Sequence, residues 1–352
     1  VGPAEVGSGT VAAGGGQHFN STAPSGDAVD AGTPLDGMPS GNIRIEEVAI
    51  RDERGVPLEP EALERRLERV VQTARQESVI LHLLDASKTG LCVPDLDTAD
   101  RLARRHSNII AVIVDAAQMR LSRSRLDQYL SRGFFVIVTG SKFFTGPPFS
   151  AALLIPADAA SHLKLPPQPM PAGFAGYATR RDLPPGLARY GDALPTGPDL
   201  GLLARWVAAL WEMSAFHAIP PAARVATIAA FEQRVRGTID RLDNLELVCA
   251  PTRRVEDGDG EKSWDEWATI FTYLILKDDG ERRPLEPAEG RRAYHWLNSD
   301  ISGLLPEYAG NDDRRLAATC CHTGQPVELA SGPDGRHIAG MRVAAGARLV
   351  SG

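Results

Sequence analysis

Two charged residues follow neighbouring apolar runs within the stretch 109–156. Asp115 comes directly after IIAVIV, and Lys142 comes shortly after FFVIVT. A lysine amine can hold an aldehyde as a Schiff base, and a carboxylate can keep a ring nitrogen protonated so that the ring acts as an electron sink. A pyridoxal 5'-phosphate (PLP) enzyme needs this pair, so the two residues indicate PLP chemistry.

Apolar runs that alternate with helical patterns must position this pair. In chain order we predict a helix at 58–77, a strand at 79–84, a helix at 95–106, a strand at 109–114, a helix at 122–132 with Gly133 just after it, and strands at 134–139 and 151–155. Strands this apolar imply a largely parallel sheet with helices on both faces. Ligands bind at the carboxyl ends of such strands, where Asp115 and Thr139 stand.

Changes in composition along the chain predict three parts. Residues 1–200 form a large cofactor-binding domain, 201–244 form long connecting helices, and 245–352 form a smaller α+β domain. Residues 20–42, rich in Ser, Gly, Pro and Asp, predict a long loop. The elements expected in the small domain are strands at LELVC, ATIFTYLIL, HTGQPVEL and GMRVAAGARLV and a helix near 286–301.

Composition excludes several classes of protein. The 352 residues are 43% hydrophobic and 24% charged, which is typical of a soluble globular chain long enough for two domains. The net charge of −7, without a basic stripe, argues against nucleic acid as a partner. The longest apolar runs are too short to span a bilayer, so we expect no membrane segment.

The four cysteines, Cys92, Cys249, Cys320 and Cys321, show no metal-binding spacing, and we expect no metal site. Their pattern suits a reducing cytoplasm.

Three short motifs resemble a known family. They are VDAAQ at 114–118, TGSK at 139–142 and GPP at 146–148, and HLLDASKTGLCVP at 82–94 is also suggestive. In this order, with strands between them, they resemble the class V aminotransferase family of fold type I PLP enzymes, which includes cysteine desulfurases. The resemblance covers roughly 45–156 and implies an α/β fold with a large domain and a smaller C-terminal one.

The resemblance implies roles for three residues of the first two motifs. Lys142 would carry PLP as a Schiff base and then shuttle the proton at the substrate α-carbon. Asp115 would pair with the pyridinium nitrogen. Gln118 would hydrogen-bond the phenolic oxygen of the ring.

Other contacts to the cofactor are implied less specifically. Thr139 and Ser141 stand where the family has phosphate-binding side chains, although the family commonly has His at the position of Ser141. Ser87 stands where a cofactor-contacting Asn is often found. Family members are typically homodimers, and a partner loop touches the phosphate. We assign that loop to 193–201, with Thr196 as donor, or else it is a plain helix-entry loop.

In the small domain, Arg342 resembles the family's carboxylate-binding arginine, with Arg348 as a competing candidate. His322 and Gln325 would line the substrate pocket. A desulfurase needs a mobile cysteine nucleophile, and the thiols of Cys320 and Cys321 beside His322 suggest one. We favour buried structural cysteines here, because Cys320 leads directly into a strand.

The N-terminal glycines allow several interpretations. GSGT at 7–10 is one candidate for the phosphate loop. Alternatively, the phosphate loop precedes Val1 and the chain begins late. We favour this second interpretation because VGPAEV resembles a strand. Gly7-x-Gly9-x-x-Ala12 also matches a Rossmann fingerprint loosely, without a credible strand before it. We expect His18 and His82 to be structural.

The leading prediction is therefore an aminotransferase-type PLP enzyme acting on an amino acid or amine through Lys142. A PLP-dependent lyase, decarboxylase or desulfurase of the same fold is the alternative. A catalytically silent PLP-fold scaffold and a nicotinamide dehydrogenase are weaker alternatives.

Overall fold

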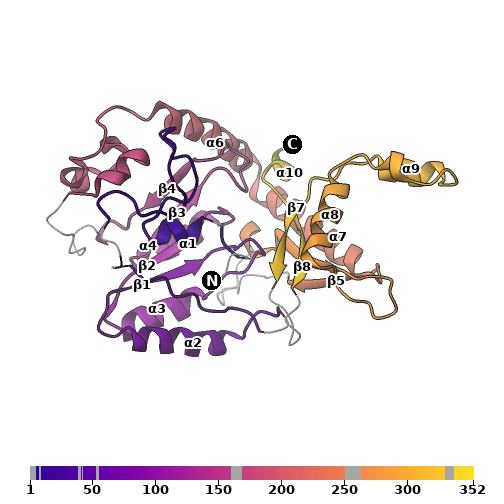
Figure 1. The fold of residues 1–352 in the computed structure, drawn as a ribbon, viewed down its shortest axis with the longest axis horizontal. Coiled ribbons are helices and arrows are strands. Elements are labelled where there is room, and N and C mark those ends of the chain that lie inside the picture. The colour runs from indigo at the N-terminus through magenta and orange to yellow at the C-terminus, as the bar shows by residue number, and fades with distance from the viewer. Residues whose placement is uncertain are drawn as a thin grey trace.

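A four-stranded sheet forms the centre of the larger part of the molecule (Figure 1). The computed structural model describes residues 5–7, 9–38, 41, 43–52, 55–159, 169–249, 263–329 and 337–352. The strands, in their order across the sheet, are β1 (Val79–Leu84), β2 (Ile109–Ala116), β3 (Phe135–Thr139) and β4 (Ala151–Leu154). The first three run parallel and β4 is antiparallel to β3, so the prediction of a mostly parallel sheet is confirmed.

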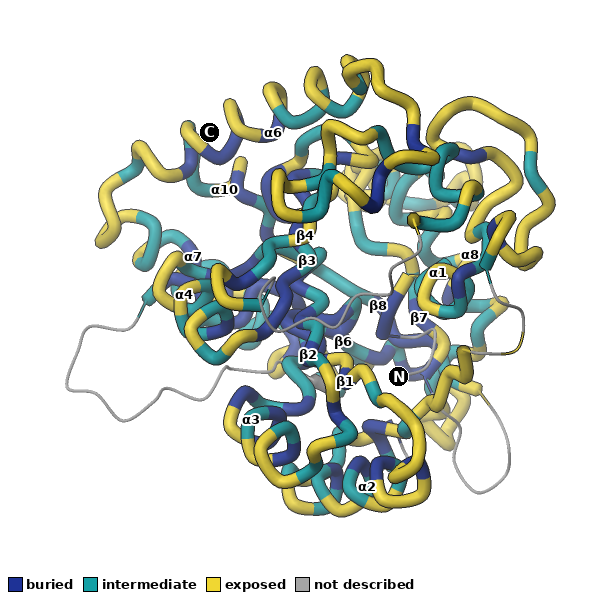
Figure 2. Tube along the Cα trace, turned by 90° about the vertical axis from the view of Figure 1, so that its left-hand side faces the viewer, coloured by how far each residue is buried: buried dark blue, intermediate teal, exposed yellow. Residues whose placement is uncertain are grey.

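Three helices, α2 (Pro60–Thr73), α3 (Leu96–Arg105) and α4 (Arg123–Ser131), pack their apolar sides on one face of this sheet. Side-chain caps begin two of them: Asp95 accepts from Thr98 N at 2.9 Å, and Ser122 accepts from Arg125 N at 3.2 Å. The outer side of α2 is mostly exposed (Figure 2). The core side chains include Leu63, Leu67 and Val71 of α2, Leu96 and Leu102 of α3, Tyr129 of α4, and Val112, Val114, Val136 and Val138 of the sheet.

The opposite face of the sheet is less covered. Side chains alternate between faces along a strand, so Ile80, His82 and Asp115 point away from the core formed with α2 and α3. Ile80 is 51% exposed there, whereas Val114 on the core face is fully buried. Asp115 of the predicted site therefore lies on the more accessible face.

A second sheet, entirely antiparallel, forms the smaller part. Its strands, in order across the sheet, are β5 (Leu245–Cys249), β6 (Ile270–Ile275), β8 (Ile338–Ala344) and β7 (Gly324–Leu329). Helix α8 (Pro287–Leu297) packs on it so closely that a Cβ added at Gly290 would lie 2.3 Å from that of Ala339.

Two long helices, α6 (Leu200–Ala218) and α7 (Pro221–Ile239), lie between the sheets in the chain. An aromatic cluster joins α6 to the loop that follows β3. Phe143 stacks on Trp264 with ring centroids 5.1 Å apart and an interplanar angle of 11°, and both rings meet Phe216 edge-on. Since Phe143 is fully buried, this cluster anchors the residue next to Lys142.

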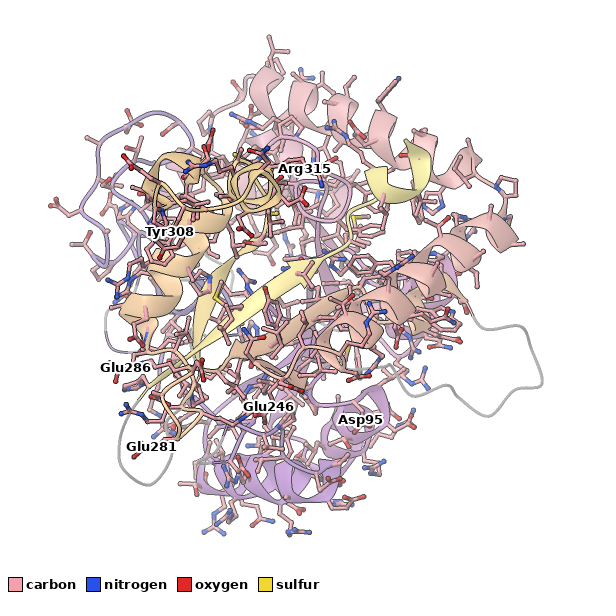
Figure 3. The ribbon with its side chains drawn as sticks, turned by 90° about the vertical axis from the view of Figure 1, so that its right-hand side faces the viewer. Asp95, Glu246, Glu281, Glu286, Tyr308 and Arg315 are labelled. Atoms are coloured by element: carbon pink, nitrogen blue, oxygen red, sulfur yellow. The ribbon has the colours of Figure 1, made fainter. Side chains whose placement is uncertain are left out.

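The other elements are short. They are α1 (Thr10–Gly14), α9 (Asn311–Ala317), α10 (Arg348–Ser351), and the 3₁₀ turns η1 (Ala172–Gly176), η2 (Arg180–Asp182), η3 (Pro185–Gly191), η4 (Trp264–Glu266) and η5 (Ser302–Leu304). Helix α9 projects from the smaller part (Figure 1), and Tyr308 lies beside it (Figure 3). Tyr308 is 91% exposed. Among the described helices, none has both the length and the apolar composition needed to cross a bilayer.

Two details of the smaller part differ from the sequence prediction. The run GMRVAAGARLV was predicted as one strand, but β8 ends at Ala344 and α10 begins at Arg348. Beyond the strand the chain turns toward the loop after β3, where Ala347 N donates to Phe143 O at 2.7 Å. Helix α9 was not predicted from the sequence.

Candidate active site

Asp115 is the penultimate residue of β2, the strand between β1 and β3. It lies level with Leu84 on one side and Ile137 on the other, and its side chain is half-buried. Its Oδ1 accepts a hydrogen bond from the backbone N–H of Ala117 at 3.1 Å. Within the described ranges no basic nitrogen lies within 4.0 Å of this carboxylate. Asp115 is thus a partly desolvated carboxylate without a cationic partner in that part of the chain.

Lys142 lies in the loop between β3 and β4, and its side chain is exposed. Gly140 N donates to Ser150 O at 3.0 Å, and Gly146 N donates to Gly140 O at 2.9 Å, so the loop is closed on itself. A Cβ added at Gly140 would lie 2.3 Å from that of Ala209 in α6, so only glycine allows this approach. In the described part of the molecule, the Lys142 amine has neither an ion pair nor a hydrogen bond.

A backbone hydrogen bond joins the two loops that carry the predicted site. Phe143 N donates to Gln118 O at 3.3 Å, which connects the residue after Lys142 to the turn after Asp115. That turn is tight, because Met119 has a φ of 51° and its N–H returns to Ala116 O at 2.7 Å. The side-chain amide of Gln118 has no hydrogen-bond partner among the described residues. The structure thus brings Asp115, Gln118 and Lys142 to one edge of the sheet.

The hydroxyls of Thr139 and Ser141 bond to each other, with an Oγ1–Oγ distance of 2.7 Å. Thr139 Oγ1 also accepts from Ser141 N at 3.2 Å. Both side chains lie immediately before Lys142, and their assignment to phosphate stays a prediction.

His82 lies on the same face of the sheet as Asp115, on the neighbouring strand β1. Its side chain retains access to solvent, yet partial desolvation by the surrounding protein lowers the pKa of His82. The negative charge of Asp115 acts in the opposite direction and raises that pKa. The imidazole therefore lies within electrostatic range of Asp115, a neighbourhood that the sequence prediction of a structural role did not include.

Ser87 belongs to a buried polar network in the turn that follows β1. Its hydroxyl donates to Glu5 Oε2 at 2.5 Å, as does that of Thr89. Arg51 pairs with Glu5 at 2.7 Å and donates to Thr89 Oγ1 at 2.7 Å. The Ser87 hydroxyl is thus bound to the Glu5 carboxylate. A contact between Ser87 and a cofactor stays a prediction.

The two candidate arginines have different surroundings. Arg348 is exposed and pairs with Glu212 of α6. Arg342 of β8 is half-buried and reaches the turn after β1, where its Nη1 donates to Lys88 O at 2.9 Å. Burial lowers the pKa of Arg342, and Glu5 raises it. The Arg342 side chain therefore reaches the turn after β1 of the parallel sheet, whereas the Arg348 side chain is bound to Glu212 of α6.

The segment before β7 contradicts one prediction. Cys320 and Cys321 were predicted to be buried structural residues, but both are exposed free thiols. They lie on a loop between α9 and β7, where the chain has left the apolar core. His322 and Gln325 are also exposed, and their place in a substrate pocket stays a prediction.

The remaining candidates lie near the surface or partly outside the described residues. Thr196 is exposed in the loop before α6. His18 is part-buried, with its Nδ1 2.7 Å from the Tyr177 hydroxyl. Ser8 of GSGT lies outside the described residues, as do residues 1–4 of VGPAEV, and Glu5 stands in a turn.

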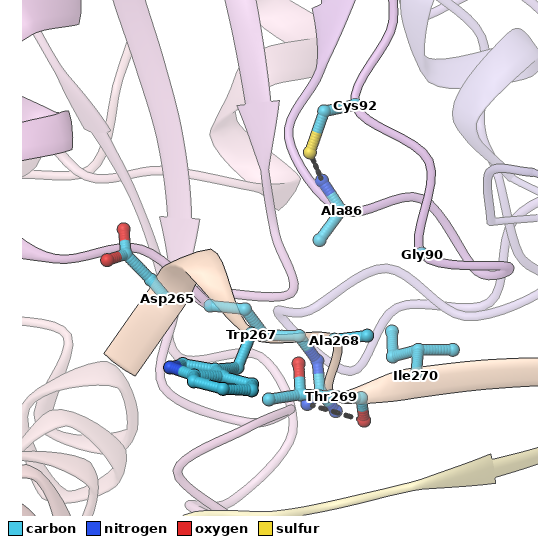
Figure 4. Close-up of a pocket in the computed structure, with 9 residues that line it drawn as sticks. Ala86, Gly90, Cys92, Asp265, Trp267, Ala268, Thr269 and Ile270 are labelled. Atoms are coloured by element: carbon cyan, nitrogen blue, oxygen red, sulfur yellow. Dashed lines mark hydrogen bonds between the residues drawn. The ribbon is translucent and has the colours of Figure 1, made fainter. Parts of the chain in front are cut away.

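A small recess lies between the turn after β1 and the segment that leads into β6 (Figure 4). Gly90 and Cys92 line one side, and Trp267 and Thr269 line the other. Arg120, two residues after Gln118, also lines it and donates to Ala345 O at 2.6 Å. The recess shows that the two sheets meet next to the turn that follows β2. Among the described residues, no group of three His, Cys, Asp or Glu side chains could hold a metal ion.

Comparisons with known proteins give only distant structural matches. No protein-family model matches the chain. No curated protein matches it either. Mouse CSAD in apo form aligns with 84% of this chain and 53% of its own, at 16% identity and a TM-score of 0.45.

Two further solved structures match this chain as distantly. Tryptophan decarboxylase from Catharanthus roseus in complex with L-tryptophan aligns at 13% identity and a TM-score of 0.43, covering 83% of this chain and 50% of that one. A decarboxylase from Sulfurospirillum multivorans aligns at 12% identity and a TM-score of 0.34, covering 82% and 57%. The chain spans about half the length of these solved structures.

Proposed function

We propose that this chain is a PLP-dependent enzyme that acts on an amino acid or amine, with Lys142 as the covalent attachment residue. The observation that carries the proposal is the position of the Asp115 carboxylate and the Lys142 amine at one edge of the sheet. Neither group has a charge partner among the described residues. Asp115 is the penultimate residue of β2, and the loop that contains Lys142 is joined to the turn after β2 by the hydrogen bond from Phe143 N to Gln118 O.

The residues present fit this cofactor. The Asp115 carboxylate has one oxygen committed to Ala117 N, which leaves the other available to a ring N–H. The amide of Gln118 can donate to a phenolic oxygen from the adjoining turn. The hydroxyls of Thr139 and Ser141, next to Lys142, can donate to phosphate if they exchange their mutual hydrogen bond for that contact.

Each residue has a separate chemical task in this proposal. When bound, PLP supplies an electron sink that stabilises negative charge at the α-carbon of the substrate. Asp115 holds the proton of the ring nitrogen, since its charge favours the protonated ring. The amine of Lys142, once released, takes or returns the proton at the α-carbon. Arg342 binds the substrate carboxylate.

The bond that breaks at the α-carbon depends on substrate orientation. We keep transamination as the leading reaction and decarboxylation or another lyase reaction as the alternative. Pyridoxamine phosphate as product identifies transamination, and release of CO₂, pyruvate or sulfide identifies a lyase. The proposal also includes a cytoplasmic homodimer in which Thr196 of one subunit reaches the other subunit's phosphate site.

Titration of the purified protein with PLP tests the proposal. We expect wild type to develop a visible absorbance band that survives gel filtration, because Lys142 binds the cofactor aldehyde covalently. Lys142→Met removes the amine and should show no such band. Lys277→Met is the matched control and should keep it, because Lys277 pairs with Glu289 in the small domain. A wild type that stays colourless with excess PLP would exclude this function.

A further inference from the structure

A groove lies between helix α8 and strand β7 in the smaller part of the molecule. Its volume is about 280 Å³. Arg291, Tyr294 and His295 line it from α8, residues 325–328 line it from β7, and Ala339 lines it from β8. The groove is therefore formed by one helix and two strands of the second sheet.

The α8 side of the groove presents three polar groups. Tyr294 and His295 follow Arg291 by three and four residues, so the three side chains share one face of the helix. In the part of the chain that the structure describes, none of these side chains has a hydrogen bond or an ion pair. Their hydrogen-bonding groups are therefore available to a ligand in the groove.

The charges that line the groove favour an acidic ligand. The Arg291 guanidinium has no carboxylate partner among the described residues. Glu328 lines the groove from β7, but its Oε1 lies 3.1 Å from His337 Nδ1, so this carboxylate has a partner of its own. A carboxylate that enters the groove can thus bind Arg291 without displacing an existing ion pair.

The β7 side of the groove is an edge of the sheet. In the order β5-β6-β8-β7, β7 pairs with β8 alone among the described strands. Backbone N–H and C=O groups along an edge strand point outward and can pair with an added strand. Pro326 suits this position, because proline within a sheet is confined to edges and bulges. An extended peptide can therefore add to β7 by strand pairing.

The size of the groove favours an extended segment over a small molecule. Pockets for small molecules measure about 300–1,000 Å³ and enclose most of the ligand. This groove is smaller, and Arg291 and His295 are exposed along it. An extended segment places most of its length beside β7 and needs to insert only one side chain.

We propose that the groove between α8 and β7 binds an extended segment of a partner protein by strand addition to β7, with an acidic side chain of that segment bound to Arg291. Tyr294 and His295 contact the same acidic side chain from α8. This interaction goes beyond the proposed function, because none of the residues assigned to the cofactor lines the groove.

Fluorescence anisotropy of labelled peptides with the full chain tests the proposal. The probes are two capped hexapeptides, one with alternating Val and Glu and one with alternating Val and Lys. We expect wild type to bind the Glu peptide about tenfold more tightly than the Lys peptide or better, the effect of one hydrogen bond between charged groups. Arg291→Gln should abolish this preference. Arg104→Gln is the matched control and should keep it, because Arg104 is 76% exposed on α3.

A third peptide separates strand addition from charge alone. It has the sequence of the Glu peptide, but its backbone nitrogens are methylated and cannot donate to β7. We expect it to bind about tenfold more weakly than the unmethylated peptide or worse, because the backbone hydrogen bonds are lost. Free glutarate should not displace the Glu peptide at equal concentration, since it has no backbone to pair with β7.

Three results would overturn the proposal. The first is equal affinity of wild type for the Glu and Lys peptides, or no binding of either at millimolar concentration. The second is a preference for the Glu peptide that survives in Arg291→Gln, with circular dichroism showing that this variant is folded. The third is equal binding of the methylated peptide, or displacement by glutarate, which would identify a site for small anions without strand addition.

Discussion

Asp115→Asn should lower turnover by about 10²- to 10³-fold, the usual effect of removing one preorganised electrostatic group from an active site. The amide has nearly the same shape as the carboxylate and can still accept from Ala117 N. It carries no negative charge, so it cannot favour a protonated ring nitrogen. The measurement is the turnover rate for the amino acid or amine that wild type converts fastest.

The same variant should keep the visible PLP band, because Lys142 is unchanged. Asp127→Asn is the matched control and should turn over like wild type, since Asp127 is 65% exposed on α4. If Asp115→Asn and Asp127→Asn have the same turnover, Asp115 is not the partner of the ring nitrogen. Loss of the PLP band together with turnover would instead indicate a role in binding.

Arg51→Ala should destabilise the fold by about 3–5 kcal/mol, because it leaves the buried Glu5 carboxylate without its cation. Arg51 also donates to Gly55 O at 2.8 Å and to Thr89 Oγ1, so three contacts disappear together. The hydroxyls of Ser87 and Thr89 compensate only part of the charge. Urea denaturation of wild type and variant gives the change in the free energy of unfolding.

Arg104→Ala is the control for this prediction. Arg104 pairs with Asp100 at 2.8 Å on α3, but its side chain is 76% exposed, so its loss should cost about 0–1 kcal/mol. Equal urea midpoints for the two variants would show that the network around Glu5 contributes no more than a surface ion pair.

The local part of the site could be predicted from the sequence. Asp115 and Lys142 each follow a run of β-branched and aromatic residues, and such runs form buried parallel strands whose carboxyl ends share one edge. The helices could also be predicted from local sequence. In α2, for example, Leu63, Leu67 and Val71 repeat at helical spacing, and all three are buried.

The long-range part could not be predicted in this way. Arg342 and Lys88 are 254 residues apart, and no spacing rule relates a strand of one sheet to a turn after a strand of another. Glu5 joins Ser87 across 82 residues for the same reason. The exposure of Cys320 was predicted wrongly because 322–329 was predicted as a strand directly after the two cysteines, whereas β7 begins only at Gly324.

Borohydride reduction of the PLP-loaded protein, followed by peptide mass spectrometry, tests the central claim most directly. Borohydride reduces the C=N bond between cofactor and lysine and fixes the cofactor where it was bound. We predict a single PLP-derived modification, on the peptide that contains Lys142. Modification of Lys88 or Lys277 in place of Lys142, or no modification at all, would contradict the assignment of Lys142 as the attachment residue.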